Sequence, residues 1–214
     1  MSTIVPTITT DNPEAYRDMI TKYHVFSNHI HVDISDGSLA PNTLMELSRV
    51  WWPENWTVDI HLMAKVPSAH MDDILNLKPS LAILHAEVDE DITALLTILK
   101  KSGIRAGVAL MKPTFPGKLT ELIQIADHVM IFSGELGQQG GKASPMQVEK
   151  VHLIKEINPD VEIGWDGGVS VDNAFMISQA GVDVLNAGSA FANSEDPTAV
   201  YKSFLTELSR RGVV

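Results

Sequence analysis

Short runs of apolar and β-branched residues recur along the whole chain, and polar stretches of helical character separate them. The intervening stretches place apolar residues three and four apart, and several begin at helix-start signals such as Asp11-Asn12-Pro13 and Ser144-Pro145. Ser170 and Gly181 mark the start and stop of another helix. The apolar runs read as strands over residues 3–8, 29–34, 57–63, 81–87, 105–110, 128–132, 161–168 and 182–190.

Eight strands alternating with helices predict an α/β fold, a (β/α)8 TIM barrel at the small end of its size range. A doubly wound open sheet is the alternative, but it normally has fewer strands and a phosphate-binding glycine loop after the first one. Here the first strand ends in Pro6-Thr7-Ile8-Thr9 without such a loop. The 214 residues are 44% hydrophobic with no linker or low-complexity tract, so we expect one barrel domain over residues 1–214.

Charge and composition exclude several classes of binding partner. The net charge of −11, from 16 basic and 27 acidic residues without a basic block, argues against nucleic acid and anionic membrane. A small anionic substrate stays compatible, because backbone amides bind anions whatever the overall charge. The chain has no cysteine, which excludes disulfide and thiolate chemistry. With neither a signal-like start nor a long apolar span, the sequence predicts a soluble, cytoplasmic protein.

Polar side chains occupy strand positions that should face the barrel mouth, where barrel enzymes carry their chemistry. His31 and Asp33 lie two apart on one strand and therefore share a face, while His61 and Asp166 come from two other strands. A lone inward histidine is more often a hydrogen-bonded core residue. Two imidazoles and two carboxylates together are costly to bury unless coordinated, so this set predicts one divalent metal ion, with Zn, Fe(II), Mn and Co all open.

The two carboxylates also predict a reaction. If their strands lie across the barrel from one another, Asp33 and Asp166 would flank a substrate held between them. One could remove a proton from carbon while the other returns one on the opposite face, with the metal stabilising an enediolate. Such an arrangement inverts a stereocentre next to a carbonyl. His85 and Glu87 share another strand face, where core packing is slightly favoured over a supporting or substrate-contacting role.

Glycines after the last three strands form a second group, in residues 134–142, 165–168 and 186–191. Together they resemble a phosphate cup, in which backbone amides and a helix start face an anion. Any one of these loops is also a common turn device. The Gly188-Ser189 step, opening a short helix, is the strongest of the three.

Four motifs in the right order carry a family resemblance: HVDISDG followed by Pro41-Asn42, then DIHLM, WDGGV and AGVDVLNAGSAF. Together they resemble the ribulose-phosphate 3-epimerase family. The resemblance implies a ribulose-phosphate-binding barrel, an isomerase of carbohydrate metabolism and the pentose phosphate pathway. Its expected reaction interconverts D-ribulose 5-phosphate and D-xylulose 5-phosphate through a metal-stabilised enediolate.

The resemblance also assigns roles to residues. His31, Asp33, His61 and Asp166 match the family's metal ligands, and Asp33 and Asp166 match its acid/base pair. Thr7 keeps a hydroxyl where the family's serine contacts substrate. The remaining matches are substrate- or phosphate-binding positions: His61, Gly167, Gly168, Gly188 and Ser189.

The chain departs from the family in the loop after residues 128–132. The family's Asn-Pro-Gly-Phe-Gly-Gly-Gln is replaced here by Ser133 to Gly141, and an ungapped match keeps Gly137 and Gln139. A shift of two or three residues instead brings Gly140 and Gly141 to the cup. Glu135 in this loop would weaken phosphate binding by about 1 kcal/mol or more at close range.

Alternatives remain at this stage. A roomier pocket would suit a ketohexose 6-phosphate such as allulose 6-phosphate, and a barrel that binds sugar phosphate without turnover is a third reading. Barrel decarboxylases and hexulose-phosphate synthases fit less well, because their Asp-x-Lys-x-x-Asp run has His61 and Ala64 here in place of the lysine and the last aspartate. Trp51-Trp52-Pro53 favours a packing or homo-oligomer surface. The native metal, the oligomeric state and the pathway stay open.

Overall fold

Eight parallel strands close into a barrel in the computed structural model, which describes residues 2–210. Each strand pairs with its neighbours in the sequence, and β1 pairs with β8 to complete the ring. This closed order confirms the predicted (β/α)8 architecture and excludes the open sheet. The strands are β1 (Thr3–Ile8), β2 (His29–Ser35), β3 (Thr57–Met63), β4 (Leu81–His85), β5 (Arg105–Leu110), β6 (His128–Phe132), β7 (Glu162–Asp166) and β8 (Val184–Ala187).

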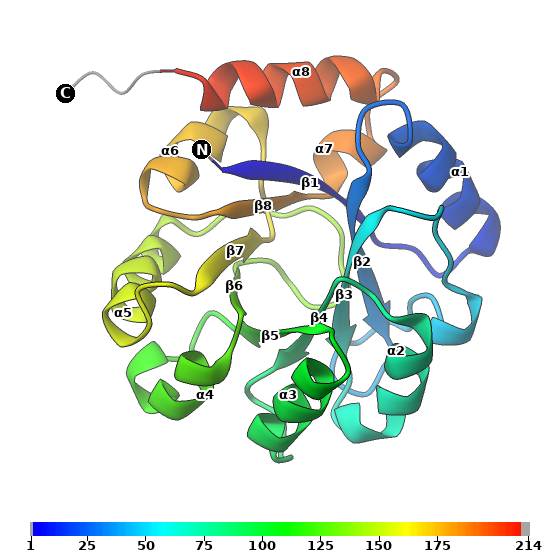
Figure 1. Ribbon diagram of the computed structural model, residues 1–214. Helices are drawn as coiled ribbons and strands as arrows, with labels where there is room; N and C mark the ends of the chain where they lie inside the picture. Colours follow the sequence, from blue (N-terminus) through cyan, green and yellow to red (C-terminus); the bar gives the residue numbers. More distant parts are fainter. Residues whose placement is uncertain (1, 211–214) are drawn as a thin grey trace.

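Helices surround the ring of strands (Figure 1). An α-helix follows every strand except β2, after which the chain forms only a 3-10 turn, Leu47–Arg49. Among the described residues, no helix has the length and hydrophobicity to cross a membrane. The helices are α1 (Pro13–Tyr23), α2 (Met71–Leu77), α3 (Ile92–Lys101), α4 (Thr120–Ile125), α5 (Glu149–Ile157), α6 (Val171–Gln179), α7 (Ser189–Ala192) and α8 (Pro197–Leu208).

Two of the predicted start signals act as helix caps, whereas Ser144 precedes a 3-10 helix, Pro145–Val148, and its side chain forms no capping hydrogen bond. The Asn12 side chain accepts hydrogen bonds from two backbone N–H groups of α1, and Ser170 forms a capping box with Asn173 at α6. Three predicted strands were too long at their carboxyl ends: β4 ends at His85 and leaves Glu87 outside the strand, β7 ends at Asp166, and β8 ends at Ala187. The strand over 161–168 ends at Asp166, because Gly167 and Gly168 adopt positive φ angles that no strand contains.

Strand alternation sorts the side chains into two layers. Val32 and Ile34 of β2 face outward into the large apolar core between strands and helices, as predicted. A smaller apolar cluster fills the barrel interior and includes Met130 and Phe132. Above it, at the carboxyl ends of the strands, the interior becomes polar, and this is where His31 and Asp33 lie.

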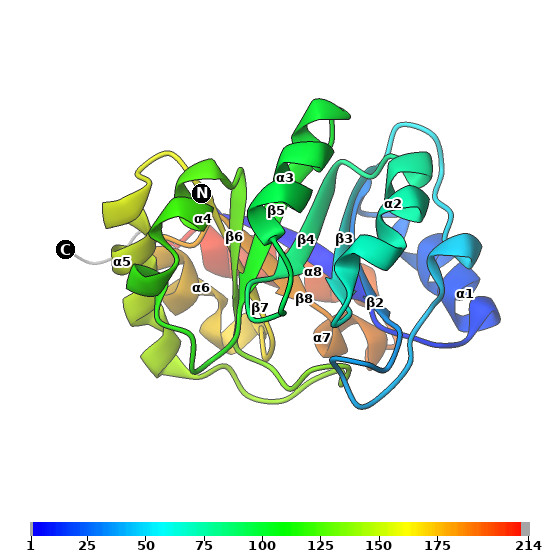
Figure 2. The same ribbon diagram turned by 90° about the horizontal axis from the view of Figure 1, so that it is seen from below.

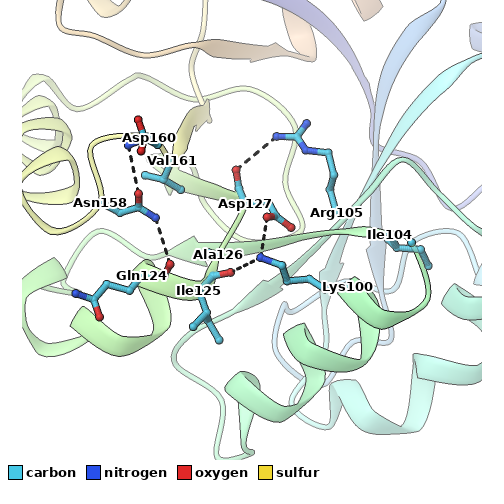
Figure 3. Close-up of a pocket in the computed structure, with 11 residues that line it drawn as sticks. Lys100, Ile104, Arg105, Gln124, Ile125, Ala126, Asp127, Asn158, Asp160 and Val161 are labelled. Carbon is cyan, nitrogen blue, oxygen red and sulfur yellow. Dashed lines mark hydrogen bonds and ion pairs between the residues drawn. The ribbon is translucent and has the colours of Figure 1, made fainter.

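Ion pairs hold the opposite, amino-terminal end of the barrel. A pocket of about 630 Å³ opens there beside Lys100, whose Nζ donates to Asp127 Oδ1 and to the Ile125 carbonyl at 2.8 Å each (Figure 3). Glu162 Oε1 lies 2.8 Å from both Arg105 Nη2 and His128 Nδ1. Lys100, Arg105 and His128 thus each have a carboxylate partner, and these contacts stabilise the barrel end.

Glu162 gives this face a pH-dependent contribution to stability. Burial alone would raise the pKa of Glu162, but His128 and Arg105 lower it from 4.5 to about 2. Because the folded-state pKa is depressed, the stabilisation is full above about pH 4.5 and disappears as pH falls towards 2. We expect Glu162→Gln to lower the unfolding free energy by roughly 1–2 kcal/mol at pH 7, after allowance for solvent screening.

Thermal unfolding at several pH values measures this effect. At pH 7 the variant should melt about 2–8 °C below wild type, and the gap should narrow between pH 4.5 and the lowest pH at which both proteins fold. Glu156→Gln, at an exposed position on α5, is the matched control and should show no gap. A gap that stays constant with pH would contradict the assignment.

Candidate active site

Four predicted side chains come together at the carboxyl end of the barrel. His31 and Asp33 come from β2, His61 from β3 and Asp166 from β7, and one ligand atom of each lies within 4.8 Å of the others. His61 Nδ1 is 2.9 Å from Asp33 Oδ1 and 3.9 Å from Asp166 Oδ2. All four are buried. The register makes this possible, since Asp33 and His61 are directly paired on adjacent strands.

The ring nitrogens of His31 have no hydrogen-bond partner in the cluster. Its ring is fully buried, and neither ring nitrogen has a hydrogen-bond partner among the described residues; Nε2 stands 3.5 Å from Asp33 Oδ1. A buried, unpaired polar atom is costly unless something else occupies its lone pair. Two imidazoles and two carboxylates form a donor set suited to a divalent metal ion, so the residues fit such an ion.

The two carboxylates differ in charge state. Burial would raise the pKa of Asp33, but the His31 imidazole, whose Nε2 lies 3.5 Å from Asp33 Oδ1, holds it well below its usual range. Burial and the nearby charge of Asp33 raise the pKa of Asp166 to about 7. Near neutral pH the site therefore pairs an ionised carboxylate with one that can carry a proton, a division typical of acid/base pairs.

From the sequence we supposed that the strands of Asp33 and Asp166 lie across the barrel from one another. In the structure they do not. In the closed order, β1 and β8 separate β2 from β7, whereas the strand opposite β2 is β6. Thr9 supports the Asp33 side: its hydroxyl donates to Asp33 Oδ2 at 2.6 Å. Sequence reasoning did not assign Thr9 to the site, although its place just after the first strand is a signal for it.

A chain of polar contacts runs away from the cluster. His61 Nε2 lies 2.8 Å from His85 Nε2, and His85 Nδ1 lies 3.4 Å from Glu87 Oε2. Burial lowers the pKa of His61 to about 4, so this ring is neutral. The Phe132 ring packs against both imidazoles, with centroids 5.7 and 5.9 Å away. The core-packing interpretation of His85 was therefore incomplete: the ring is buried, but it contacts a member of the cluster.

A small cavity adjoins the cluster and contains many of the predicted substrate positions. Its volume is only about 30 Å³. The Thr7 hydroxyl and the Asn186 side-chain oxygen, both buried, have no hydrogen-bond partner among the described residues and are free to meet a ligand. Asn186 was missed, although it stands at the start of the NAGSAF stretch. The lining includes Thr7, Thr9, Gly140, Asp166, Gly167, Gly168, Asn186, Gly188 and Ser189.

The segment 133–144 covers this cavity. Figure 2 shows it running along one end of the barrel from β6 towards the loop after β2. A Cβ atom on Gly167 would lie 2.1 Å from the Gly134 nitrogen, and one on Gly168 would lie 2.1 Å from the Ala143 nitrogen. These two glycines thus make room for the segment. A cavity of about 30 Å³ is far smaller than a sugar phosphate, so such a ligand requires the segment to move.

In the loop after β6, which departs from the family pattern, only some of the predicted residues reach the cavity. Gly140 lies beside Ser189 at the cavity, whereas Gly137 and Gly141 are absent from the lining. Gly137 instead packs on the loop after β2, where its carbonyl accepts from Asn42 Nδ2 at 3.3 Å. Glu135 forms an ion pair with Lys112. The carboxylate that seemed to oppose a phosphate is therefore neutralised by a lysine outside the cluster.

Known proteins resemble the chain in both sequence and fold. The sequence model of the ribulose-phosphate 3 epimerase family matches residues 3–192. The ribulose-phosphate 3-epimerase of Helicobacter pylori is 32% identical over 177 residues, covering 79% of this chain and 82% of the relative. That of Aquifex aeolicus is 28% identical over 174 residues, covering 78% of each. A crystal structure of 3-hexulose-6-phosphate synthase superposes with a TM-score of 0.72 at 17% identity, covering 98% and 100% of the chains, which shows a shared fold.

Proposed function

Because the chain belongs to the ribulose-phosphate 3-epimerase family, a family of isomerases, we propose that it interconverts D-ribulose 5-phosphate and D-xylulose 5-phosphate with a divalent metal ion bound. The observation that carries this proposal is the pair of unlike carboxylates, Asp33 and Asp166, beside two buried imidazoles. Epimerisation next to a carbonyl needs one group that accepts a proton and one that donates it.

The carboxylates supply both roles. In one direction Asp33, which is ionised, removes the proton from C3, and protonated Asp166 returns a proton to the other face. In the reverse direction each carboxylate takes the other role. Thr9 donates to Asp33 and holds its carboxylate in place. Burial and the charge of Asp33 raise the pKa of Asp166, which favours the protonated form that this return needs.

His31, Asp33, His61 and Asp166 would hold the metal ion. When bound, the ion supplies positive charge that stabilises the enediolate formed after proton removal. The phosphate end of the substrate would occupy a separate place, the cavity lined by Gly167, Gly168, Gly188 and Ser189, whose backbone N–H groups would donate to it. Asp166 is the one carboxylate residue in this lining. Gly140 joins this group, while Gly137 and Gly141 require movement of segment 133–144 to reach it.

Isotope exchange tests the proposal. The purified protein is stripped of metal, reconstituted separately with Zn, Mn, Fe(II) or Co, and incubated in D2O with ribulose 5-phosphate or allulose 6-phosphate. We expect deuterium at C3 and formation of the epimer from the pentose phosphate, only in metal-loaded samples.

Each other outcome identifies an alternative. Exchange with the hexose phosphate alone would make the protein a ketohexose-phosphate epimerase. Exchange in the metal-free protein would remove the metal from the mechanism. No exchange from any sugar, together with a metal content that reconstitution fails to raise, would favour a sugar-phosphate-binding barrel without turnover.

A further inference from the structure

Four side chains form a continuous line from the metal-binding group to the surface of the barrel mouth. They contact one another in the order Asp33, His61, His85 and Glu87. The contacts are 2.9 Å at Asp33 Oδ1 to His61 Nδ1, 2.8 Å between the two Nε2 atoms, and 3.4 Å at His85 Nδ1 to Glu87 Oε2. Both imidazole rings are fully buried, so water does not complete their hydrogen bonds.

Counting the protons shows which atom donates the hydrogen bond at each contact. It contains three contacts, and each needs one proton or cation between its two acceptor atoms. Two neutral imidazoles bring only two N–H protons. If Glu87 accepts one from His85 Nδ1, then His85 Nε2 is an acceptor and takes the other from His61 Nε2. His61 Nδ1, beside Asp33, is then left with a free lone pair, which suits a cation at that contact.

Glu87 is fixed in the role of acceptor. Its other oxygen, Oε1, accepts from the Met111 backbone N–H at 2.8 Å and from the Thr114 hydroxyl. Burial would raise the pKa of Glu87, but contacts with His85, Thr114 and Met111 lower it, so the group is a carboxylate. A carboxylate accepts hydrogen bonds and donates none, which orients both rings.

We propose that His85 and Glu87 are positioning residues that hold His61 with its proton on Nε2 and its Nδ1 lone pair facing the metal site. The inference rests on the proposed metal dependence. It assigns a role beyond the four ligands, in a pattern where the second nitrogen of a ligating histidine is fixed by a hydrogen-bonded partner. Here that partner is another histidine, His85. Glu87 fixes the position of the proton on His85, and His85 in turn fixes it on His61.

The substitution Glu87→Gln should reverse the direction of hydrogen-bond donation along His61 and His85, with almost no change in side-chain size. Met111 N–H and the Thr114 hydroxyl both point at Oε1, so the carbonyl oxygen of the new amide must occupy that position. Its NH2 group then faces His85 Nδ1 and donates to it. His85 must carry its proton on Nε2 and donate to His61 Nε2, which puts the His61 proton on Nδ1, where it blocks the metal.

The test measures Zn affinity by competition with a chromophoric chelator, and histidine protonation by 15N NMR of the Zn-loaded protein. We expect Glu87→Gln to raise the dissociation constant for Zn about 10- to 100-fold. Wild type should show protons on His61 Nε2 and His85 Nδ1. His85→Gln, whose amide oxygen can accept from His61 Nε2, should lose less affinity than Glu87→Gln, although it removes a ring.

His128→Gln is the matched control, because it breaks another buried histidine–carboxylate pair at the far end of the barrel; its Zn affinity should equal that of wild type. Unchanged affinity in Glu87→Gln, a proton on His61 Nδ1 in wild type, or a larger loss in His85→Gln would overturn this inference alone. A wild-type protein that takes up no divalent ion would overturn it together with the metal dependence of the proposed function.

Discussion

Replacing Asp166 by asparagine should lower the rate of epimerisation about 10²- to 10⁴-fold. The C3 proton of one epimer should still exchange with solvent, while that of the other epimer should not. An amide neither accepts nor returns the proton on its face of the substrate. Asp33, ionised beside His31 and His61, can still remove and return a proton on its own face. The measurement is deuterium incorporation at C3 from each epimer separately, alongside the rate of interconversion.

Two precautions make the Asp166→Asn result specific. Because Asp166 is also a proposed metal ligand, metal content is measured and the assay uses saturating metal. Asp36→Asn is the control: this carboxylate lies just after β2, where it accepts from the Ser38 N–H in a turn and pairs with His70. Equal exchange from both epimers in metal-loaded Asp166→Asn would remove Asp166 from proton transfer.

The barrel and its cluster of two histidines and two aspartates could be predicted from sequence because both depend on simple periodicities. Two-residue alternation placed His31 and Asp33 on one inward face, and eight apolar runs defined the ring that brings His61 and Asp166 beside them. Strand ends were less predictable, since only backbone angles reveal that Gly167 cannot continue β7.

Features that depend on contacts between distant segments lay beyond the sequence. The contact between His61 and His85 joins two neighbouring strands, but its distance of 2.8 Å follows from side-chain rotamers that no pattern encodes. The strand 6 loop posed a similar problem. Glu135 pairs with Lys112 from the preceding strand's loop, and this neutralisation is invisible when the loop is read alone.

Replacing Gly168 by alanine should lower kcat/KM about 100-fold, because it combines a strained backbone with a collision in the substrate site. Its φ angle is +73°, and the added Cβ would lie 2.1 Å from the Ala143 nitrogen. The backbone of segment 133–144 must then move away from β7, or the Gly168 amide must move out of the cup. Either change separates the amides proposed to hold phosphate from the carboxylates proposed to act on C3.

Gly103→Ala separates the two causes. Gly103 has a similar φ angle of +78°, but a Cβ there meets nothing within 4 Å. This control should lose roughly 1–2 kcal/mol of stability from backbone strain alone and keep its kcat/KM. Gly168→Ala should show a comparable or larger stability loss together with the kinetic defect, most of it in KM for the phosphorylated substrate. If both variants keep wild-type kinetics, segment 133–144 moves aside without any loss of activity, and Gly168 has no part in binding phosphate.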